Sequence, residues 1–572
     1  MSFNHMLNHL DIDTAWQHLH WLNDNAPARI NGSGDDLKAA EYFADNFDHY
    51  GLEAVVDHFQ TYRSIPNRGS LRLLSPVVSD IRCEACGHIA STSDKGFEAE
   101  LVNVGYGDHS DYSAANVKGA VVLADITSGP ARPEKARIAA DHSAAGIIFT
   151  NMGPPEHENI PMGAIKSIWG NPTRASFKEI PPVPAVGITR KDGDILRLCC
   201  EQGKVYIHMI AQATQDWGTL PQSRARLRGG ANTTGDVIVV AGHFDAWEPG
   251  MSDNAAGNAL ILELARAFSN HKESLRRDII FGMWNGHEIG EIAGSTWFLD
   301  RNWDELDVNG IAYFNIDSVG FSGASFFETA SSAELVRFHQ AVERKVLGQP
   351  ASRKKLTRSN EQPFFPVGMP AMEGSFRFSD EQIAAWDNAA GGWWWHSTAD
   401  TLDKVDQERF RQTFQLYAGY IHTMATTPVL PMDYRAVGVD LAERISAVEC
   451  EAGDAFPLDL PIEAFQNATG KLDVVVGDIN SDSDVHRFNQ VIKRLGRILM
   501  PAFETLGGRY EQDRVAQPAL KSPLPLLHDL PEFLRSPSDS NEHNLLSTEL
   551  LRGRNKMADA LRRATETIEH VC

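Results

Sequence analysis

The sequence predicts an α/β protein with a mostly parallel sheet, helices on both faces of that sheet, an inserted β-rich domain and a C-terminal helical domain. Two apolar runs, at 237–242 and 279–284, are typical of buried strands, and ionisable residues follow each run. Strand-like and helix-like segments alternate over 216–430, which favours parallel pairing. Short β-like runs separated by turn residues fill 61–215, and amphipathic helices are predicted over 431–572.

These changes of pattern predict three structural units. A chain of 572 residues is too long for a single hydrophobic core. We expect one domain from residues 1–60 and 216–430, a second from 61–215 and a third from 431–572. Within the first, Ala40, Phe43, Phe47 and Tyr50 recur at helical spacing and predict one apolar helix face.

Composition excludes several classes of protein. The net charge of −23 disfavours nucleic acid and anionic membranes as partners, and no apolar run approaches membrane-spanning length. The first residues have neither the basic nor the apolar segment of a secretion signal. Together with only six cysteines in 572 residues, this predicts a soluble protein of the reducing cytoplasm.

Metal-ligand types of side chain recur where predicted strands end. Two imidazoles and three carboxylates form this group: His243, Asp253, Glu288, Asp317 and His396. Such nitrogen and oxygen ligands suit zinc, or another divalent metal such as manganese or cobalt. Five ligands are too many for one tetrahedral zinc with an open position, and they suit two metals bridged by a carboxylate. Asp245 is placed to accept the second ring N–H of a ligand histidine.

These residues stand in motifs that resemble the zinc-dependent aminopeptidase and glutamate carboxypeptidase family. The resemblance is strongest to the branch that contains glutamate carboxypeptidase and the transferrin receptor. The matching segments are Gly-His-Phe-Asp at 242–245, Asp-Asn-Ala-Ala-Gly at 253–257, His-Glu-Ile-Gly at 287–290, Gly-Ser-Thr at 294–296, Asn-Ile-Asp-Ser at 315–318 and His-Ser-Thr-Ala-Asp-Thr-Leu-Asp at 396–403.

The resemblance implies a role for each predicted domain. Residues 1–60 and 216–430 would form the metallopeptidase-like catalytic domain, 61–215 a protease-associated domain, and 431–572 a helical domain that forms a homodimer. His243 and Asp317 would hold one zinc and Glu288 and His396 a second, with Asp253 as the bridge. The Asp253–Asn254 peptide bond would be cis.

One position departs from the family pattern. The family has two adjacent glutamates, a general base and a ligand, where this chain has His287 and Glu288. One extra residue also precedes Gly294, and Glu291 would lie on the same face as His287 if a helix began there. Three arrangements follow: His287 is the general base, His287 is a ligand and a glutamate is the base, or His287 and Glu291 form a hydrogen-bonded pair in a site without peptidase activity. We favour His287 as base, because imidazole accepts protons near neutral pH.

The predicted substrate contacts are Trp394, Trp395 and Arg377. Trp395 precedes the last histidine ligand, where relatives often carry tyrosine, and tryptophan donates only through its indole N–H. Core packing is an equally good explanation for the three consecutive tryptophans at 393–395. Arg377 precedes the site in sequence, and it does not by itself predict specificity for glutamate.

We therefore expect a metal-dependent hydrolase, a peptidase or amidohydrolase, which cleaves an amide bond in a small peptide or N-acyl amino acid. Two alternatives stay open. The chain would be a binding module, as the transferrin receptor is, or a metal-dependent enzyme of acyl transfer, cyclisation or elimination. Retention of all five ligand-type residues argues against a binding module.

Overall fold

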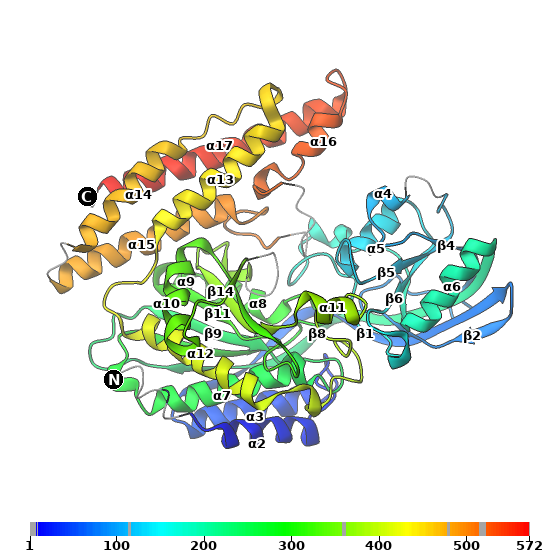
Figure 1. Ribbon diagram of the computed structural model, residues 1–572, viewed down its shortest axis with the longest axis horizontal. Coiled ribbons are helices and arrows are strands. Elements are labelled where there is room, and N and C mark those ends of the chain that lie inside the picture. The colour runs from blue at the N-terminus through cyan, green and yellow to red at the C-terminus, as the bar shows by residue number, and fades with distance from the viewer. Residues whose placement is uncertain are drawn as a thin grey trace.

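The computed structural model describes Leu7 and residues 10–112, 116–356, 362–477, 481–513 and 522–570. It has three parts: a central α/β body, an inserted domain on one side and a group of long helices that projects from the body (Figure 1). A sheet of 14 strands runs through the body and the inserted domain.

The central part of the sheet is mostly parallel. In spatial order, β14, β11, β9 and β10 are parallel neighbours, while β12 and β8 pair antiparallel on either side of them. The central strands are β9 (Val237–His243), β10 (Asp278–Trp284), β11 (Gly310–Asn315), β12 (Phe326–Ser331), β13 (Ser352–Lys355) and β14 (Ala371–Arg377).

Both faces of this sheet are covered by helices. Alternate residues of β9 point to opposite faces, so Ile238 and Val240 join one core and Val237 and Val239 join another. Helices α2, α3, α7 and α12 pack in the first core, where Phe47 of α3 stacks on Phe281. The helices of the body are α2 (Ile12–Asn25), α3 (Asp35–His49), α7 (Ala256–Ser269), α8 (Ala293–Arg301), α9 (Trp303–Asn309), α10 (Val336–Leu347), α11 (Asp380–Ala385) and α12 (Gln407–Thr426).

Two long strands join the body to the inserted domain. β1 (Glu53–Ser75) and β8 (Val205–Leu227) pair antiparallel along nearly their whole length. One end of β8 pairs with β10 of the body and the other with β4 of the inserted domain. That domain contains β2 (Ser79–Ile81), β3 (Cys83–Ala85), β4 (Phe97–Asn103), β5 (Val121–Asp125), β6 (Gly146–Thr150), β7 (Ala185–Ile188), α4 (His109–Tyr112), α5 (Arg132–Asp141) and α6 (Arg190–Gln202).

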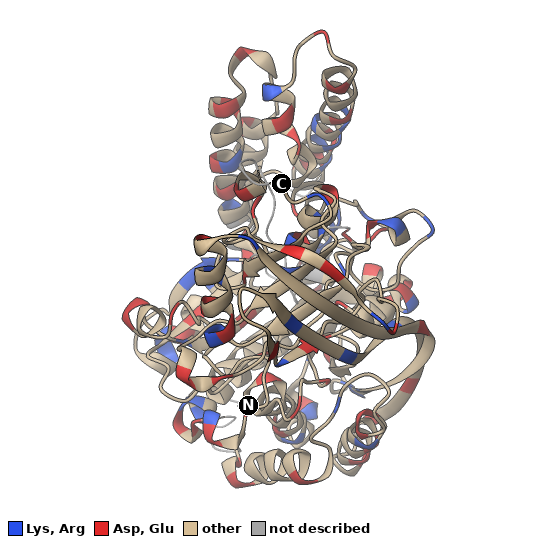
Figure 2. Ribbon diagram, turned by 90° about the vertical axis from the view of Figure 1, so that its right-hand side faces the viewer, with Lys and Arg blue, Asp and Glu red and all other residues tan. Residues whose placement is uncertain are grey.

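The C-terminal region is helical and is tied to the body by buried cations. Lys493 donates to Asp236 at 2.6 Å, and Arg497 donates to the carbonyl oxygens of Leu306 and Gly368. The helices are α13 (Tyr434–Ala452), α14 (Ile462–Gly477), α15 (Asp482–Phe503), α16 (Leu530–Arg535) and α17 (Asn541–Glu569). Acidic and basic residues are interspersed over them and over the inserted domain (Figure 2).

This architecture confirms the predicted fold class, including the inserted domain and the helical C-terminal region. Among the residues that the structure describes, no helix combines the length and the apolar character that a membrane crossing needs.

Candidate metal centre

The fold brings the five ligand candidates together at the carboxyl ends of the parallel strands. His243 is the last residue of β9, and Glu288 and Asp317 follow β10 and β11. Asp253 lies in the turn η3 (Met251–Ala255), which leads into α7, and its own backbone there is not helical, with φ −133° and ψ 89°. His396 lies in the loop before α12. Open α/β sheets place their sites at this edge because the loops after parallel strands meet there.

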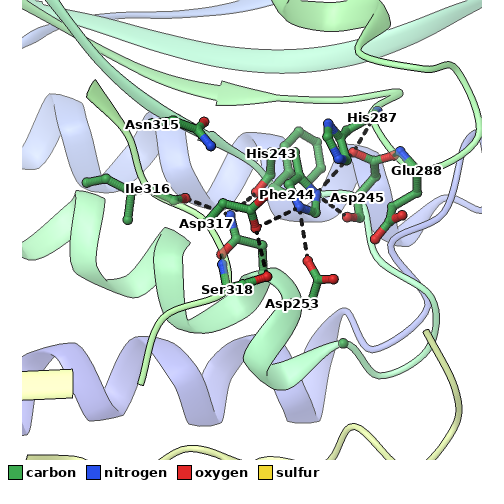
Figure 3. Close-up of polar contacts among 12 residues, drawn as sticks. His243, Phe244, Asp245, Asp253, His287, Glu288, Asn315, Ile316, Asp317 and Ser318 are labelled. Carbon is green, nitrogen blue, oxygen red and sulfur yellow. Dashed lines mark hydrogen bonds and ion pairs between the residues drawn. The ribbon is translucent and has the colours of Figure 1, made fainter. Parts of the chain in front are cut away.

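The two carboxylate oxygens of Asp253 face different partners. His243 Nε2 lies 3.1 Å from Asp253 Oδ1 and 3.2 Å from Asp317 Oδ1 (Figure 3). His396 Nε2 lies 3.5 Å from Asp253 Oδ2 and 3.1 Å from Glu288 Oε2. This is the arrangement of a bridging carboxylate between two ligand sets.

The electrostatics of this cluster fit bound cations. All three carboxylates are buried, and Glu288 Oε1 has no hydrogen-bond partner among the residues that the structure describes. Burial lowers the pKa of His243, but Asp317 and Asp253 outweigh that effect and raise it well above its usual value. Burial likewise opposes protonation of His396, yet Glu288 and Asp253 raise its pKa to about 9. The cluster therefore demands positive charge, which divalent metals supply with the same nitrogen and oxygen ligands.

Asp245 uses different atoms from those that the sequence suggested. The Nδ1 atom of His243 lies 2.8 Å from the backbone carbonyl oxygen of Asp245 and 3.8 Å from its carboxylate. The carboxylate instead accepts the backbone N–H groups of His287 at 3.1 Å and Glu288 at 2.9 Å. Burial raises the pKa of Asp245 to about 7. Asp245 thus orients His243 through its main chain and the following ligand loop through its side chain.

The backbone around Asp253 is held by a carboxylate that sequence reasoning missed. Asp400 accepts the backbone N–H groups of Ser252 and Asp253, each at 3.0 Å. The Asp253–Asn254 peptide bond is cis, as the family resemblance implied, and the Asn254 side chain donates to the carbonyl oxygen of Ile316 at 2.9 Å. The only sequence signal for Asp400 was its place four residues after His396 in a matched motif.

His287 lies against the first ligand set. Its ring stacks on that of His243, with centroids 4.1 Å apart and planes inclined by 17°. A ligand atom of His287 lies within 4.8 Å of ligand atoms of His243 and Asp317. Burial, reinforced by His243, lowers the pKa of His287 well below its usual value, so the ring is neutral at pH 7. This geometry is compatible with His287 as a general base and with His287 as a metal ligand.

No helix begins at His287, so the condition under which Glu291 would lie one helical turn away is not met. Residues 287–292 form turns, and α8 begins only at Ala293. Glu291 and Ile292 both have left-handed backbones, with φ of 49° and 62°. Burial raises the pKa of Glu291 to about 8, although Lys166 and Arg132 oppose that shift.

The cluster opens into a cavity of about 510 Å³ between the body and the inserted domain. The inserted domain contributes Arg132, Met152 and Trp169 to its wall, and the body contributes Glu291 and Ile292. Arg132 forms no ion pair with a described residue; burial lowers its pKa, but the charges of Glu288 and Glu291 oppose that effect, and its guanidinium lies over the ring of Phe149 at 6.0 Å. Sequence reasoning missed Arg132 because it is remote in the chain from every ligand.

Neighbouring tryptophans have different positions. Trp395 lines the cavity, and its indole N–H donates to Asp253 Oδ2 at 2.7 Å. Trp394 is only 3% exposed, donates to Ser252 Oγ and packs against Phe378 in the core. The prediction of Trp394 as a substrate contact is therefore wrong, because its ring is buried in the core and does not line the cavity.

Arg377 lines the far end of the cavity, but carboxylates already face it. Its Nη2 atom lies 3.2 Å from Glu373 Oε1, and its Nε atom lies 4.0 Å from Glu328 Oε1. All three side chains line the cavity, so this end is polar and has charges of both signs.

The fold and the ligand set define an α/β protein with a candidate two-metal hydrolase centre. Residues 224–421 match the model of peptidase family M28, and residues 97–196 match that of the PA (protease-associated) domain. The central body thus carries a region that matches peptidase family M28, and the inserted domain matches the PA domain.

Among curated proteins, the chain is 24% identical over 420 residues to "Aminopeptidase YwaD" of Bacillus subtilis (strain 168), covering 71% of this chain and 84% of that protein. It is 23% identical over 360 residues to "Probable glutamate carboxypeptidase AMP1" of Arabidopsis thaliana, which covers 53% of this chain and only 50% of the plant protein.

Solved structures share the fold. The peptidase M28 precursor from Shewanella amazonensis SB2B superposes with a TM-score of 0.61 at 18% identity, covering 75% of this chain and 97% of that one. BSAP, a zinc aminopeptidase from Bacillus subtilis, superposes with a TM-score of 0.57 at 22% identity, covering 73% and 96%.

Proposed function

We propose that this chain is a metal-dependent peptide hydrolase that acts as an aminopeptidase on short peptides and holds two zinc ions. The observation that supports this most directly is the geometry of Asp253, whose two oxygens face separate His–carboxylate pairs at 3.1 and 3.5 Å. A cluster with a purely structural role has no need for three buried carboxylates on two imidazoles. The aminopeptidase names of the bacterial relatives favour this activity.

Each residue has a definite part in this proposal. Zinc at the two ligand sets would polarise the scissile carbonyl and lower the pKa of a water. His287 accepts a proton from the attacking water through a ring nitrogen and returns it to the leaving amine. Its neutral ring, held beside His243, is in the protonation state that this first step requires. Asp245 fixes the loop through the N–H groups of His287 and Glu288.

The cavity favours short substrates. Its volume of about 510 Å³ suits a peptide of a few residues. Arg132, without an ion-pair partner among the described residues, offers a cation to the carboxylate of such a peptide. Trp395 and Trp169 supply apolar wall area for a side chain.

The test is a library of di- to tetrapeptides, with free and with acetylated N-termini, incubated in ¹⁸O-labelled water with the zinc-loaded protein. We expect release of the N-terminal residue with one ¹⁸O in its new carboxyl group, and no reaction of the acetylated series. Cleavage of acetylated peptides would instead favour an amidohydrolase or carboxypeptidase. Products that lack added water would favour cyclisation or acyl transfer. Complete inertness with no bound metal would favour a binding module.

A further inference from the structure

We call the metal that Glu288 and His396 would hold the second metal. One segment of the PA domain contacts both of the loops that carry these two residues. We call residues 159–170 the clamp segment. At its start, the side-chain amide of Asn159 donates to the carbonyl oxygen of Trp393 at 3.2 Å. The backbone N–H of Met162 donates to the carbonyl oxygen of His396 itself at 2.9 Å. The His396 loop is thus fixed from the PA side.

The other end of the clamp segment holds the loop of Glu288. Lys166 is fully buried, and its ammonium donates to the carbonyl oxygen of Gly290 at 2.6 Å and to that of Gly170. The N–H of Gly170 donates in turn to the carbonyl oxygen of Glu291 at 2.8 Å. Two successive carbonyl groups of this turn therefore depend on the PA domain for their hydrogen bonds.

Apolar contacts close the same junction. Ala164 packs with Ile289 and Trp247, whose indole N–H donates to Glu288 Oε2 at 3.1 Å. Trp169 packs on Ile292. The left-handed backbone of residues 291–292 is thus enclosed by the clamp segment on its PA side.

The ligands of the first metal are held by elements of the body. His243 belongs to β9 and Asp317 directly follows β11, adjacent parallel strands of the central sheet. Asp253 is held by Asp400, also from the body. Among the described residues, the side chains of His243 and Asp253 form their hydrogen bonds with partners in the body.

We propose that the PA domain positions the ligands of the second metal site. Lys166 then acts as a positioning residue for Glu288, and only the second site depends on the clamp segment. The proposal rests on the two-metal centre of the proposed function. Residues that orient ligands typically change metal affinity by about 10- to 100-fold when they are removed. The loss is expected at the site of Glu288 and His396 and not at the site of His243 and Asp317.

The experiment titrates metal-free full-length protein with Zn²⁺ by calorimetry and with Co²⁺ by visible absorbance. In Lys166→Met one of the two Kd values should rise by about 10- to 100-fold and the other should stay within about twofold. Asn159→Ala, a milder change on the His396 loop, should raise the same Kd by a few fold. Excess zinc should restore kcat in both variants.

Lys135 provides a matched control. It is also a buried PA-domain lysine whose ammonium donates to two carbonyl oxygens, those of Tyr106 and Ser128, but it contacts neither ligand loop. Lys135→Met should leave both Kd values unchanged.

Unchanged metal affinity in both clamp variants would overturn the proposal, and so would equal weakening of both sites. A wild-type protein that binds only one metal would overturn it as well. Two metals in the wild type, selective weakening in the variants and no hydrolysis of any peptide would support the clamp and reject the proposed peptidase.

Discussion

At the scale of single residues, His287 decides the chemistry. It occupies the position where the family resemblance implies a glutamate base, and its ring lies 4.1 Å from that of His243. We predict that His287→Ala lowers kcat by about 10²- to 10⁴-fold, the usual contribution of a general base. Zinc content should not change, because the five other ligand candidates remain. Steady-state kinetics with elemental analysis would measure both.

Two comparisons make this prediction specific. His287→Glu should keep most of the activity, since it restores a proton acceptor at the same place. His142→Ala, which removes an imidazole stacked on Tyr112 in the PA domain, should have no effect. A loss of zinc in His287→Ala would make this residue a ligand. A larger fall of kcat in Glu291→Gln than in His287→Ala would transfer the role of base to Glu291.

At the scale of elements, the packing of α2 on α3 makes stability depend on pH. His18 of α2 is buried between the hydroxyl groups of Tyr42 and Tyr50, at 2.6 and 3.0 Å. Burial, with a smaller contribution from Arg266, lowers its pKa from 6.5 to about 4. The unfolded chain therefore binds this proton first as the pH falls. The stabilisation is complete above pH 6.5 and is lost as the pH falls toward 4.

From this shift we expect the wild type to lose about 2 kcal/mol of stability between pH 7.5 and pH 5 through His18 alone. His18→Gln cannot titrate, so its stability should fall less over the same range. Urea unfolding of both proteins at the two pH values measures the difference. Parallel pH profiles for the two proteins would contradict the assignment.

At the scale of the whole molecule, we expect both the activity and the stability of the fold to depend on bound metal. We predict that chelation abolishes hydrolysis and lowers Tm, and that two equivalents of zinc restore both. A ligand at 100 times its Kd stabilises the folded state by about 2.7 kcal/mol. Differential scanning calorimetry with and without chelator measures the shift. Asp253→Asn, which weakens the bridge, should show a smaller shift, and an unchanged wild-type Tm would argue against bound metal.

The predicted homodimer also belongs to this scale. Leu545 and Leu551 of α17 and Val439 of α13 are exposed apolar residues on the projecting helices. We expect sedimentation equilibrium to give a mass near twice 63.2 kDa. A monomer at micromolar concentration would contradict this prediction.

The sequence predicted the fold and indicated candidate ligands for a physical reason. A buried strand needs a continuous apolar run, so the ionisable residues at the ends of β9, β10 and β11 stand out. The orientation of neighbouring side chains in a loop has no such signal. Trp394 and Trp395 are consecutive, yet one is buried in the core and the other faces the cavity. Lys166 and Gly290 are 124 residues apart in the sequence, and they meet only because the inserted domain packs against the body.

The two 23-residue strands β1 and β8 form a long antiparallel ribbon that resists bending. The chain passes between the body and the PA domain only through these two strands. A rotation of the PA domain relative to the body would therefore have to bend their hydrogen-bonded backbones. The β1–β8 pairing changes register between Pro66 and Arg68, and again only between Leu73 and Ser75 at the end of β1. We therefore expect the cavity wall to keep its shape when it is empty. Substrates should enter and leave along its open side, at rates set by diffusion and fit rather than by a hinge.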